Sequence, residues 1–538
     1  MIRTNQLMIA VMYVFLAAGC CSAKDIYVAQ DATGAETGAD CADAHPVSWF
    51  NTASNWGSTA GRIGAGTTVH LCGIFTAPGG TSGYLKFHGS GASANPITLH
   101  FENGAVLTAP YWGQGGSSQI GNLSYLVVDG VCTASDPMGR CSSTQGTIQS
   151  TLNGSPDGTC PGGPCQFQVN GSAISMGSCD NCEIKNLTIA DMYVHTPTSN
   201  DRGQHDALWL SGNNNLAVDN NIIHDAHWAV CLSYTPAGTV NLSVFNNNIW
   251  NVDHGVAVAS SGNSSLSGLY IYNILIHDFA NWDTASDYDH HDGVHIFATS
   301  TSTISPPVMI YNNHFYGNFG ANDNTAMFIE VFTGGSYMGE HYVFNNIIAP
   351  SGGGCANGGM AEDNGLGGNG MHFYNNTMIG CGIDIAYAKI SSATNAVIEN
   401  NIYSGSGASG ETGIDNVVGG STIAISNYNL WYGTWTNNPM RYSDWFKTMA
   451  LWTSKTGFDR NSITTNPKLS PTFQLTSTSP AIGAGTNLTS ICKGQPVPGL
   501  GALCKDYVGN PRPPSGNWDM GAYVHTLGSP TGLTGVVH

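Results

Sequence analysis

The stretch "LAVDNNIIHDAHWAVCL" (residues 216–232) is followed by "LSVFNNNIWNVDHGVAV" (residues 242–258), which repeats its pattern. Each consists of an apolar strand, a pair of asparagines, a second short strand and a third. Shorter versions occur near residues 269, 308, 342, 371 and 396, at intervals of about 25 to 39 residues. Alternating Val, Ile, Tyr and Phe at a regular repeat predicts stacked strands, with one coil per repeat.

The paired asparagines mark the same corner of each coil. Asn tolerates a left-handed backbone, and its amide can bond to the Asn stacked above it. Each coil would then contact only its neighbours, as in other solenoids. The sequence therefore predicts an all-β chain.

Composition restricts the possible partners. The 538 residues include 69 Gly, and 16 Lys and Arg stand against 35 Asp and Glu, for a formal charge of −19. Such a chain cannot neutralise a phosphate backbone, which argues against nucleic acid. An acidic polysaccharide would need a bridging cation, and calcium is the one we consider.

The first residues resemble an export signal. Residues 1–23 contain Arg3, an apolar run and then small residues, which indicates a signal peptide and no membrane span. We expect a secreted or periplasmic monomer; attachment to the outer membrane through a lipid on Cys20 is the alternative. Thirteen cysteines follow, and the default interpretation is disulfides between close pairs, with Cys231 left over: Cys41–Cys72, Cys132–Cys141, Cys160–Cys165, Cys179–Cys182, Cys355–Cys381 and Cys492–Cys504. Zinc held by Cys160, Cys165, Cys179 and Cys182 is the other option.

Three regions of the chain resemble the right-handed parallel β-helix of the pectate lyase-like superfamily. They are the Asn-rich coils, the opening "DIYVAQDATGAETGADCADA" (residues 25–44) with "GAGTTVHLCGIFTA" (64–77), and the closing "SPAIGAG" (479–485) with "DYVGNPRPPSGNWDMGAY" (506–523). The resemblance implies that fold and an exported protein. It does not fix the reaction, since the fold carries lyases, hydrolases, esterases, epimerases and adhesins.

On this basis the chain divides into five segments. They are a signal peptide (1–23), an N-terminal cap with the first coils (24–135), a Cys/Gly/Pro-rich insertion (136–170), the β-helix body (171–440) and a closing segment (441–538). Within the last segment, Ser443 is predicted to cap a short helix. Its apolar face, with Trp445, Phe446, Met449 and Trp452, would cover the open end of the solenoid.

Aligning the third strands by a small residue and two aliphatics places polar residues in columns. The strands are "HDALWL" (205–210), "HWAVCL" (227–232), "DHGVAV" (253–258), "HDGVHI" (291–296) and "NTAMFI" (324–329). Stacked residues lie roughly 4.8 Å apart, so they can share a ligand or a proton, whereas His291 and His295 would be roughly 13 Å apart. The predicted catalytic set is Asp292, Asp253, His254 and His291, with Asp206 and His205 at the margin of the cleft.

Several side chains beside this set are predicted to bind a sugar, because aromatic faces pack against sugar rings while polar groups bond to hydroxyls. They are Trp209, Trp228, His227, His295, Arg202, Trp282, Tyr288 and Phe328. Corner residues that only bond the backbone are the structural alternative. We assign no metal; a site of His205, His227, Asp253 and His291 is a chemically sensible alternative.

These residues predict an enzyme that acts on a polysaccharide. Hydrolysis would use Asp292 and Asp253, assisted by His254 and His291. "HDGVHI" and "DHGVAV" are similar to signatures of polygalacturonase-type hydrolases, but the chain lacks that family's paired aspartates and its Arg-Ile-Lys segment. A lyase, with or without calcium, and a carbohydrate-binding surface protein are the alternatives.

Overall fold

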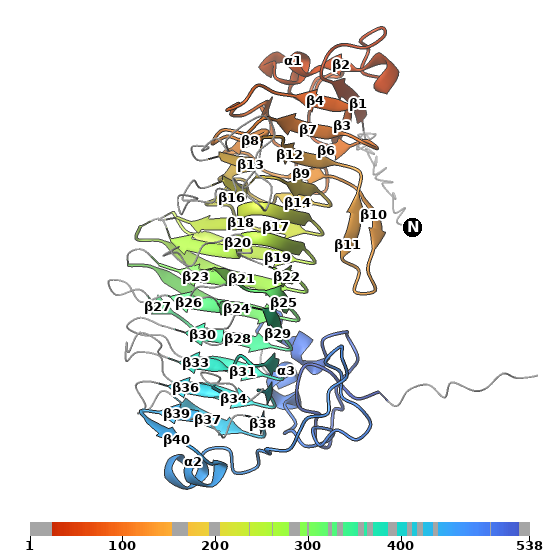
Figure 1. Ribbon diagram of the computed structural model, residues 1–538. Coiled ribbons are helices and arrows are strands. Elements are labelled where there is room, and N and C mark those ends of the chain that lie inside the picture. The colour runs from red at the N-terminus through yellow and green to blue at the C-terminus, as the bar shows by residue number, and fades with distance from the viewer. Residues whose placement is uncertain are drawn as a thin grey trace, which may run out of the picture.

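The computed structural model shows a long stack of coils that runs from α1 (Val47–Phe50) at one end to α2 (Met449–Thr456) at the other (Figure 1). It confirms the predicted right-handed parallel β-helix. The structure describes residues 24–152, 171–192, 205–235, 237–260, 262–278, 291–298, 301–320, 325–330, 337–352, 360–362, 370–385, 395–405, 412–416, 423–433, 440–494 and 497–526. In that part of the chain no helix is long and apolar enough to cross a membrane.

From β3 (Thr67–Cys72) onward, each coil contributes one strand to each of three faces, and the apolar side chains that point inward form one continuous core. The first face contains β1 (Lys24–Ala29), β3 (Thr67–Cys72), β6 (Ile97–Phe101), β9 (Leu126–Asp129), β14 (Glu183–Lys185), β17 (Leu216–Asp219), β19 (Thr239–Phe245), β21 (Ser265–Tyr272), β24 (Thr303–Tyr311), β28 (His341–Phe344), β31 (Met371–Tyr374), β34 (Ala396–Glu399) and β37 (Ile423–Asn427), with β2 (His45–Pro46) and β27 (Tyr337–Met338) beside it.

The second face follows the asparagine corner and the third follows the next bend. The second contains β4 (Ile74–Thr76), β7 (Val106–Ala109), β12 (Thr147–Ser150), β15 (Thr188–Ala190), β22 (Leu275–His277), β25 (His314–Asn318), β29 (Ile347–Gly352), β32 (Thr377–Ile379), β35 (Ile402–Ser404) and β38 (Leu430–Tyr432). The third contains β5 (Leu85–Lys86), β8 (Ser118–Gly121), β13 (Gly171–Gly177), β16 (His205–Ser211), β23 (Asp292–Phe297), β26 (Thr325–Glu330), β30 (Met360–Glu362), β33 (Ile383–Ile385), β36 (Ile414–Asn416) and β39 (Met440–Tyr442). Two long strands, β18 (Ile222–Tyr234) and β20 (Asn248–Ser260), run through both.

The asparagine pairs form a ladder at the first corner. The first Asn of a pair has a left-handed backbone, as at Asn345 (φ 55°) and Asn375 (φ 53°). The second is buried: the side-chain Oδ1 of Asn376 accepts from the backbone N–H and the side-chain amide of Asn346, both at 3.0 Å, while the Asn376 side-chain amide donates to the Val343 backbone carbonyl at 2.9 Å. Asn401 continues the ladder in the next coil. Both predicted roles of the asparagines are confirmed.

Replacing Asn376 by Ala should destabilise the protein by about 3 kcal/mol, because each buried polar group left without a partner costs about 1–3 kcal/mol. Denaturant unfolding measures the loss. Asn241→Gly is the matched control, since Asn241 is exposed and has a φ of 54°, which Gly tolerates. Equal stability of the two variants would show that the ladder contributes nothing.

The second bend contains a small residue in every coil around the site. Ala207, Ala229 and Ala326 occupy it, with Gly255 and Gly293 in the coils between. A Cβ on Gly293 would lie 2.5 Å from Phe315 in the core. The small residue and the aliphatic after it both face inward, as Ala229 and Val230 do. The regular alternation of inward-facing and outward-facing side chains along the strand is therefore interrupted at this bend.

The far end of the solenoid is closed by α2, as predicted, but the helix begins later. Thr448 is its N-cap and accepts from the Leu451 N–H, whereas Ser443 has a φ of 61° in the tight turn between β39 and β40 (Asp444–Phe446). Trp445 and Phe446 thus lie on an antiparallel strand. The prediction that Ser443 caps the helix was wrong because the pairing of β40 with β39 competes with helix formation. Trp452 is fully buried and donates to Asp459 at 2.8 Å.

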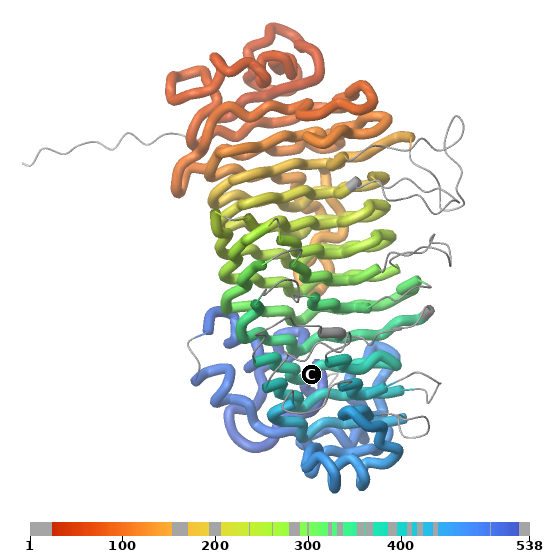
Figure 2. The backbone as a smooth tube through the Cα atoms, turned by 90° about the vertical axis from the view of Figure 1, so that its left-hand side faces the viewer, coloured from red at the N-terminus to blue at the C-terminus, as the bar shows by residue number. Residues whose placement is uncertain are grey.

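The closing segment runs back along the outside of the later coils, where it contains α3 (Thr489–Gly494) and the 3₁₀ helix η3 (Leu500–Cys504) (Figure 2). Its Leu488, Leu500 and Trp518 pack against Tyr342 and Tyr374 of the first face. At the N-terminal end, the shorter 3₁₀ helices are η1 (Cys41–Asp43) and η2 (Ala53–Asn55).

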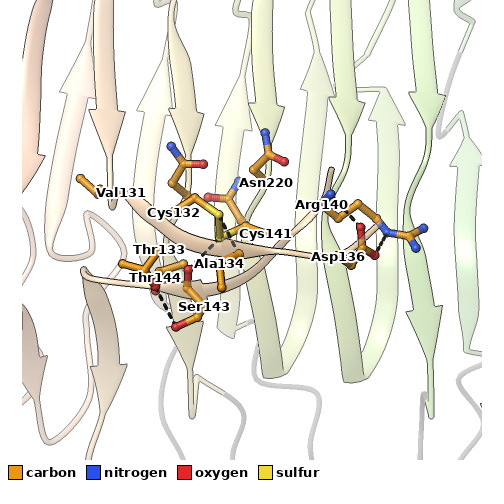
Figure 3. The surroundings of a disulfide bond; sticks show 12 residues. Val131, Cys132, Thr133, Ala134, Asp136, Arg140, Cys141, Ser143, Thr144 and Asn220 are labelled. Carbon is orange, nitrogen blue, oxygen red and sulfur yellow. Dashed lines mark hydrogen bonds and ion pairs between the residues drawn. A yellow bond between two sulfur atoms is a disulfide. The ribbon is translucent and has the colours of Figure 1, made fainter. Parts of the chain in front are cut away.

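A hairpin of β10 (Cys132–Ser135) and β11 (Cys141–Thr144) projects along the stack toward the closing segment. The Cys132–Cys141 disulfide joins its strands, and at its tip Arg140 pairs with Asp136 at 2.7 Å (Figure 3). Arg140 also donates to the Tyr507 hydroxyl at 3.3 Å, which ties the hairpin to the closing segment. Since β12 pairs with β7 and β15, residues 147–150 of the predicted insertion belong to a coil.

The structure contains the predicted disulfides Cys41–Cys72, Cys132–Cys141, Cys179–Cys182 and Cys492–Cys504, and Cys231 is free and buried. The bond between Cys179 and Cys182 removes both from the alternative zinc site. Cys160, Cys165, Cys355 and the signal peptide lie outside the described residues. Disulfides are typical of proteins that fold in an oxidising compartment.

Candidate functional site

The strands of the third face stack in the predicted register. Trp228 lies opposite His254, which lies opposite Asp292 and then Thr325. In the next outward column, Trp209 is followed by Cys231, Ala257, His295 and Phe328. β16 begins at His205, opposite Gly171, but the side chain of His205 lies outside the described part, as do Arg202, Trp282, Tyr288 and Asn324.

Asp253 is the centre of a hydrogen-bonded cluster. Its Oδ2 lies 2.6 Å from His254 Nδ1, 2.9 Å from Trp228 Nε1 and 3.5 Å from His227 Nε2, and its Oδ1 lies 2.5 Å from His291 Nδ1. Burial alone would raise the pKa of Asp253, but His254, His291 and His227 together hold that pKa well below its ordinary value. Asp253 is therefore a fixed negative charge that orients three imidazoles.

A second carboxylate completes a chain of contacts through two histidines. His254 Nε2 lies 2.9 Å from His295 Nδ1, and His295 Nε2 lies 3.2 Å from Glu330 Oε2. The chain thus runs from Asp253 through His254 and His295 to Glu330. The prediction that His295 lies too far along the strand to join the cluster was wrong.

The bend at Gly255 and Gly293 explains this error. A spacing of 13 Å holds only along a straight strand, whereas here the alternation is interrupted after Asp292. As a result Asp292 and His295, three residues apart, approach on the same side of the strand, with Asp292 Oδ2 at 3.8 Å from His295 Nδ1.

Asp292 is fully buried and anchored to the next coil. Its Oδ1 accepts from the Thr325 backbone N–H at 3.1 Å and from the Thr325 hydroxyl at 2.7 Å. Its Oδ2 lies 3.7 Å from His254 Nε2. Asp253 and Asp292 consequently approach the two opposite nitrogens of the same imidazole.

Asp206 lies at the other side of the cluster. Its Oδ1 is 3.4 Å from His227 Nδ1, so His227 bridges Asp206 and Asp253. Burial raises the pKa of Asp206 above its ordinary value, although His227 acts in the opposite direction. Two carboxyl groups that share one histidine therefore have pKa values displaced in opposite directions.

Asp206 also lines a cavity of about 450 Å³ on the third face. The other lining residues are Ser82, Gln114, Gly115, Gln119, Gly171, Ser172, Ser175 and Trp209. A neighbouring hollow of similar volume shares Gln119 and Ser175 and includes Lys86. An indole, hydroxyls and amides around a buried carboxyl group are suited to a sugar.

The remaining aromatic residues of the predicted binding set lie within the cluster. Trp228 stacks on His227 with ring centroids 5.3 Å apart, and its N–H is bonded to Asp253. Phe328 stacks on His295 at 5.3 Å. Of the predicted aromatic residues that the structure describes, Trp209 is the one that lines the cavity.

Two groups of residues were missed from the sequence. Ser172 and Ser175 belong to "GSAISMG" (171–177), which stacks directly before "HDALWLS"; its Ala173 and Ile174 carry the same small-aliphatic signal, one coil earlier than the alignment began. Glu330 was missed because it lies two residues after Phe328, beyond the end of the aligned segment.

Comparison with known proteins leaves the family open. No family model and no curated protein matches the sequence. Solved structures do resemble it: pectate lyase Pel9A (13% identity, TM-score 0.40, covering 93% of this chain and 96% of that one) and XylC in complex with xylose (12%, 0.42, 93% and 98%). The PL6 family alginate lyase AlyGC is similar over 77% of this chain and 52% of its own, at 13% identity and a TM-score of 0.43. At such values these similarities carry no conclusion about activity.

Proposed function

We propose that this protein is an enzyme that cleaves glycosidic bonds in an extracellular polysaccharide, with Asp206 as the group that protonates the leaving oxygen. The observation that carries the proposal is the position of Asp206, a buried carboxyl group with a raised pKa in the wall of the cavity that contains Trp209. A raised pKa keeps a carboxyl group protonated at a pH where an ordinary aspartate has lost its proton.

His227 gives Asp206 a route by which to recover its proton. The imidazole lies between Asp206 Oδ1 and Asp253 Oδ2, at 3.4 Å and 3.5 Å. When Asp206 has donated its proton, a His227 ring that is protonated on both nitrogens, and whose positive charge Asp253 stabilises, can pass its Nδ1 proton to Asp206 and is left neutral. In hydrolysis, the bond between the anomeric carbon and the leaving oxygen breaks, and the hydroxide of a water molecule bonds to that carbon. The remaining proton of this water replaces the one that His227 gave to Asp206.

The sequence pattern predicts hydrolytic roles for Asp292 and Asp253, whereas the geometry favours other roles for both. We propose Asp253 as the orienting charge and His254 and His291 as the imidazoles that it positions. Asp292 accepts two hydrogen bonds from Thr325 and, unlike Asp206, does not line the described cavity, which suits a positioning residue better than one that contacts a polymer. The places of His205 at the margin of the cleft and of Arg202 in substrate binding stay predictions, because the Arg202 residue and the His205 side chain lie outside the described part of the chain.

Hydrolysis and elimination both need protonation of the leaving oxygen, so an acid at Asp206 is compatible with either reaction. Product analysis separates them. The purified chain is incubated with a panel of neutral and acidic polysaccharides, with and without calcium. We expect new reducing ends without the ultraviolet absorbance of an unsaturated product. Reducing ends accompanied by that absorbance would identify a lyase, and binding without either signal would identify a carbohydrate-binding protein.

A further inference from the structure

Three buried ligand atoms converge where β20 meets β23. They are His254 Nε2, His295 Nδ1 and Asp292 Oδ2, and the exposed fractions of the side chains are 6%, 6% and 0%. The two nitrogens lie 2.9 Å apart, and Asp292 Oδ2 lies 3.7 Å and 3.8 Å from them.

The outer contacts determine which ring nitrogens carry hydrogen. Asp253 lies at 2.6 Å from His254 Nδ1 and Glu330 at 3.2 Å from His295 Nε2. An ionised carboxylate only accepts, so each outer nitrogen donates, and in a neutral imidazole the inner nitrogen then presents a lone pair. Two lone pairs that face each other at 2.9 Å, beside a carboxylate oxygen, require a positive species between them.

A metal ion fits this arrangement better than a proton. A shared proton would join the two nitrogens only, since Asp292 Oδ2 is beyond hydrogen-bonding distance of both. The point in the plane of the three atoms that is equidistant from them lies about 2.0 Å from each, which is the length of zinc bonds to imidazole and carboxylate.

We propose that His254, His295 and Asp292 bind one divalent first-row transition metal ion. Two imidazoles and one carboxylate favour such an ion over calcium, which prefers oxygen ligands. Asp253 and Glu330 are the outer carboxylates that fix the two rings, as in many zinc sites. The ion would link β20 to β23. This site is separate from the acid role proposed for Asp206.

Zinc content tests the site without any assay of activity. The full chain is stripped with a chelator, reloaded with Zn²⁺ and analysed by mass spectrometry for metal, with affinity measured by competition against a chromogenic chelator. We expect one zinc ion per chain, and we expect added Ca²⁺ not to displace it. His295→Gln should weaken binding by at least about 100-fold, and Glu330→Gln, which removes an outer carboxylate, by about 10- to 100-fold.

His100→Gln is the matched control. His70, His100 and Glu102 form the other described group with three ligand atoms close together, on the first face. This variant should retain full zinc binding. The Glu330 side chain is 28% exposed, so Glu330→Gln should fold even if His295→Gln does not. Absence of stoichiometric zinc in the wild type, or its loss in His100→Gln but not in Glu330→Gln, would overturn the proposal.

Discussion

The Asp206→Asn variant should lose about 10²- to 10⁴-fold in turnover on the polysaccharide that the wild type cleaves, which is the range that a general acid contributes. The amide matches the carboxyl group in size and can still bond to His227, but it cannot give a proton to the leaving oxygen. Initial rates at saturating substrate measure the loss. Because the cavity keeps its shape, KM should change far less than kcat.

Asp225→Asn is the matched control for this variant. Asp225 lies on β18 two residues before His227, has a left-handed backbone that Asn tolerates, and contacts His224 at 2.6 Å. It should retain full activity. If Asp206→Asn were as active as Asp225→Asn, the assignment of the acid would fail, and the cavity would be a binding site only.

The raised pKa of Asp206 also has a consequence for the pH dependence of stability. Above the ordinary pKa of an aspartate, the unfolded chain has released this proton while the folded chain still holds it. The free energy of unfolding should therefore fall as the pH rises from that ordinary value to the raised one. Asp206→Asn cannot titrate, so its stability relative to wild type should improve across the same window in denaturant unfolding.

The fold was predictable because each coil repeats the same local constraints. Asn at a left-handed corner and Val or Ile facing the core recur with one strand per face, so the repeat indicates the coil and the asparagines indicate its corner. The register of the third face was predictable for the same reason. Only one alignment places Ala229, Gly255 and Gly293 at the bend with an aliphatic residue after each.

The shape of the site was not predictable from those columns. Column order tells which residues stack, but the distance between Asp292 and His295 depends on the bend at Gly293, and a glycine alone does not reveal a bend. The cavity wall was missed because Gln114 and Ser172 belong to stretches of the third face, 114–121 and 171–177, that contain no His or Asp. Their contribution arises from the stacking of the coils, and side-chain chemistry alone gives no sign of it.

The Asp253→Asn variant should lose about 3–5 kcal/mol of stability, as expected when one member of a buried, hydrogen-bonded charge network is removed. Asp253 is 8% exposed and accepts from Trp228 while it contacts three imidazoles. An amide has one accepting oxygen, and its NH₂ group would face donors that the carboxylate now satisfies.

Denaturant unfolding measures the loss, and hydrogen exchange locates it. Because a solenoid coil contacts mainly its neighbours, the backbone amides of β18, β20 and β23 should exchange faster while those of β1 and β3 do not change. Asp225→Asn again serves as the control: its ion pair with His224 is partly exposed, so its loss should cost less than about 1 kcal/mol. Equal stability of Asp253→Asn and Asp225→Asn would contradict the role of Asp253. Removal of a carboxylate that holds three imidazole rings in place should lower the free energy of unfolding more than removal of a partly exposed ion pair.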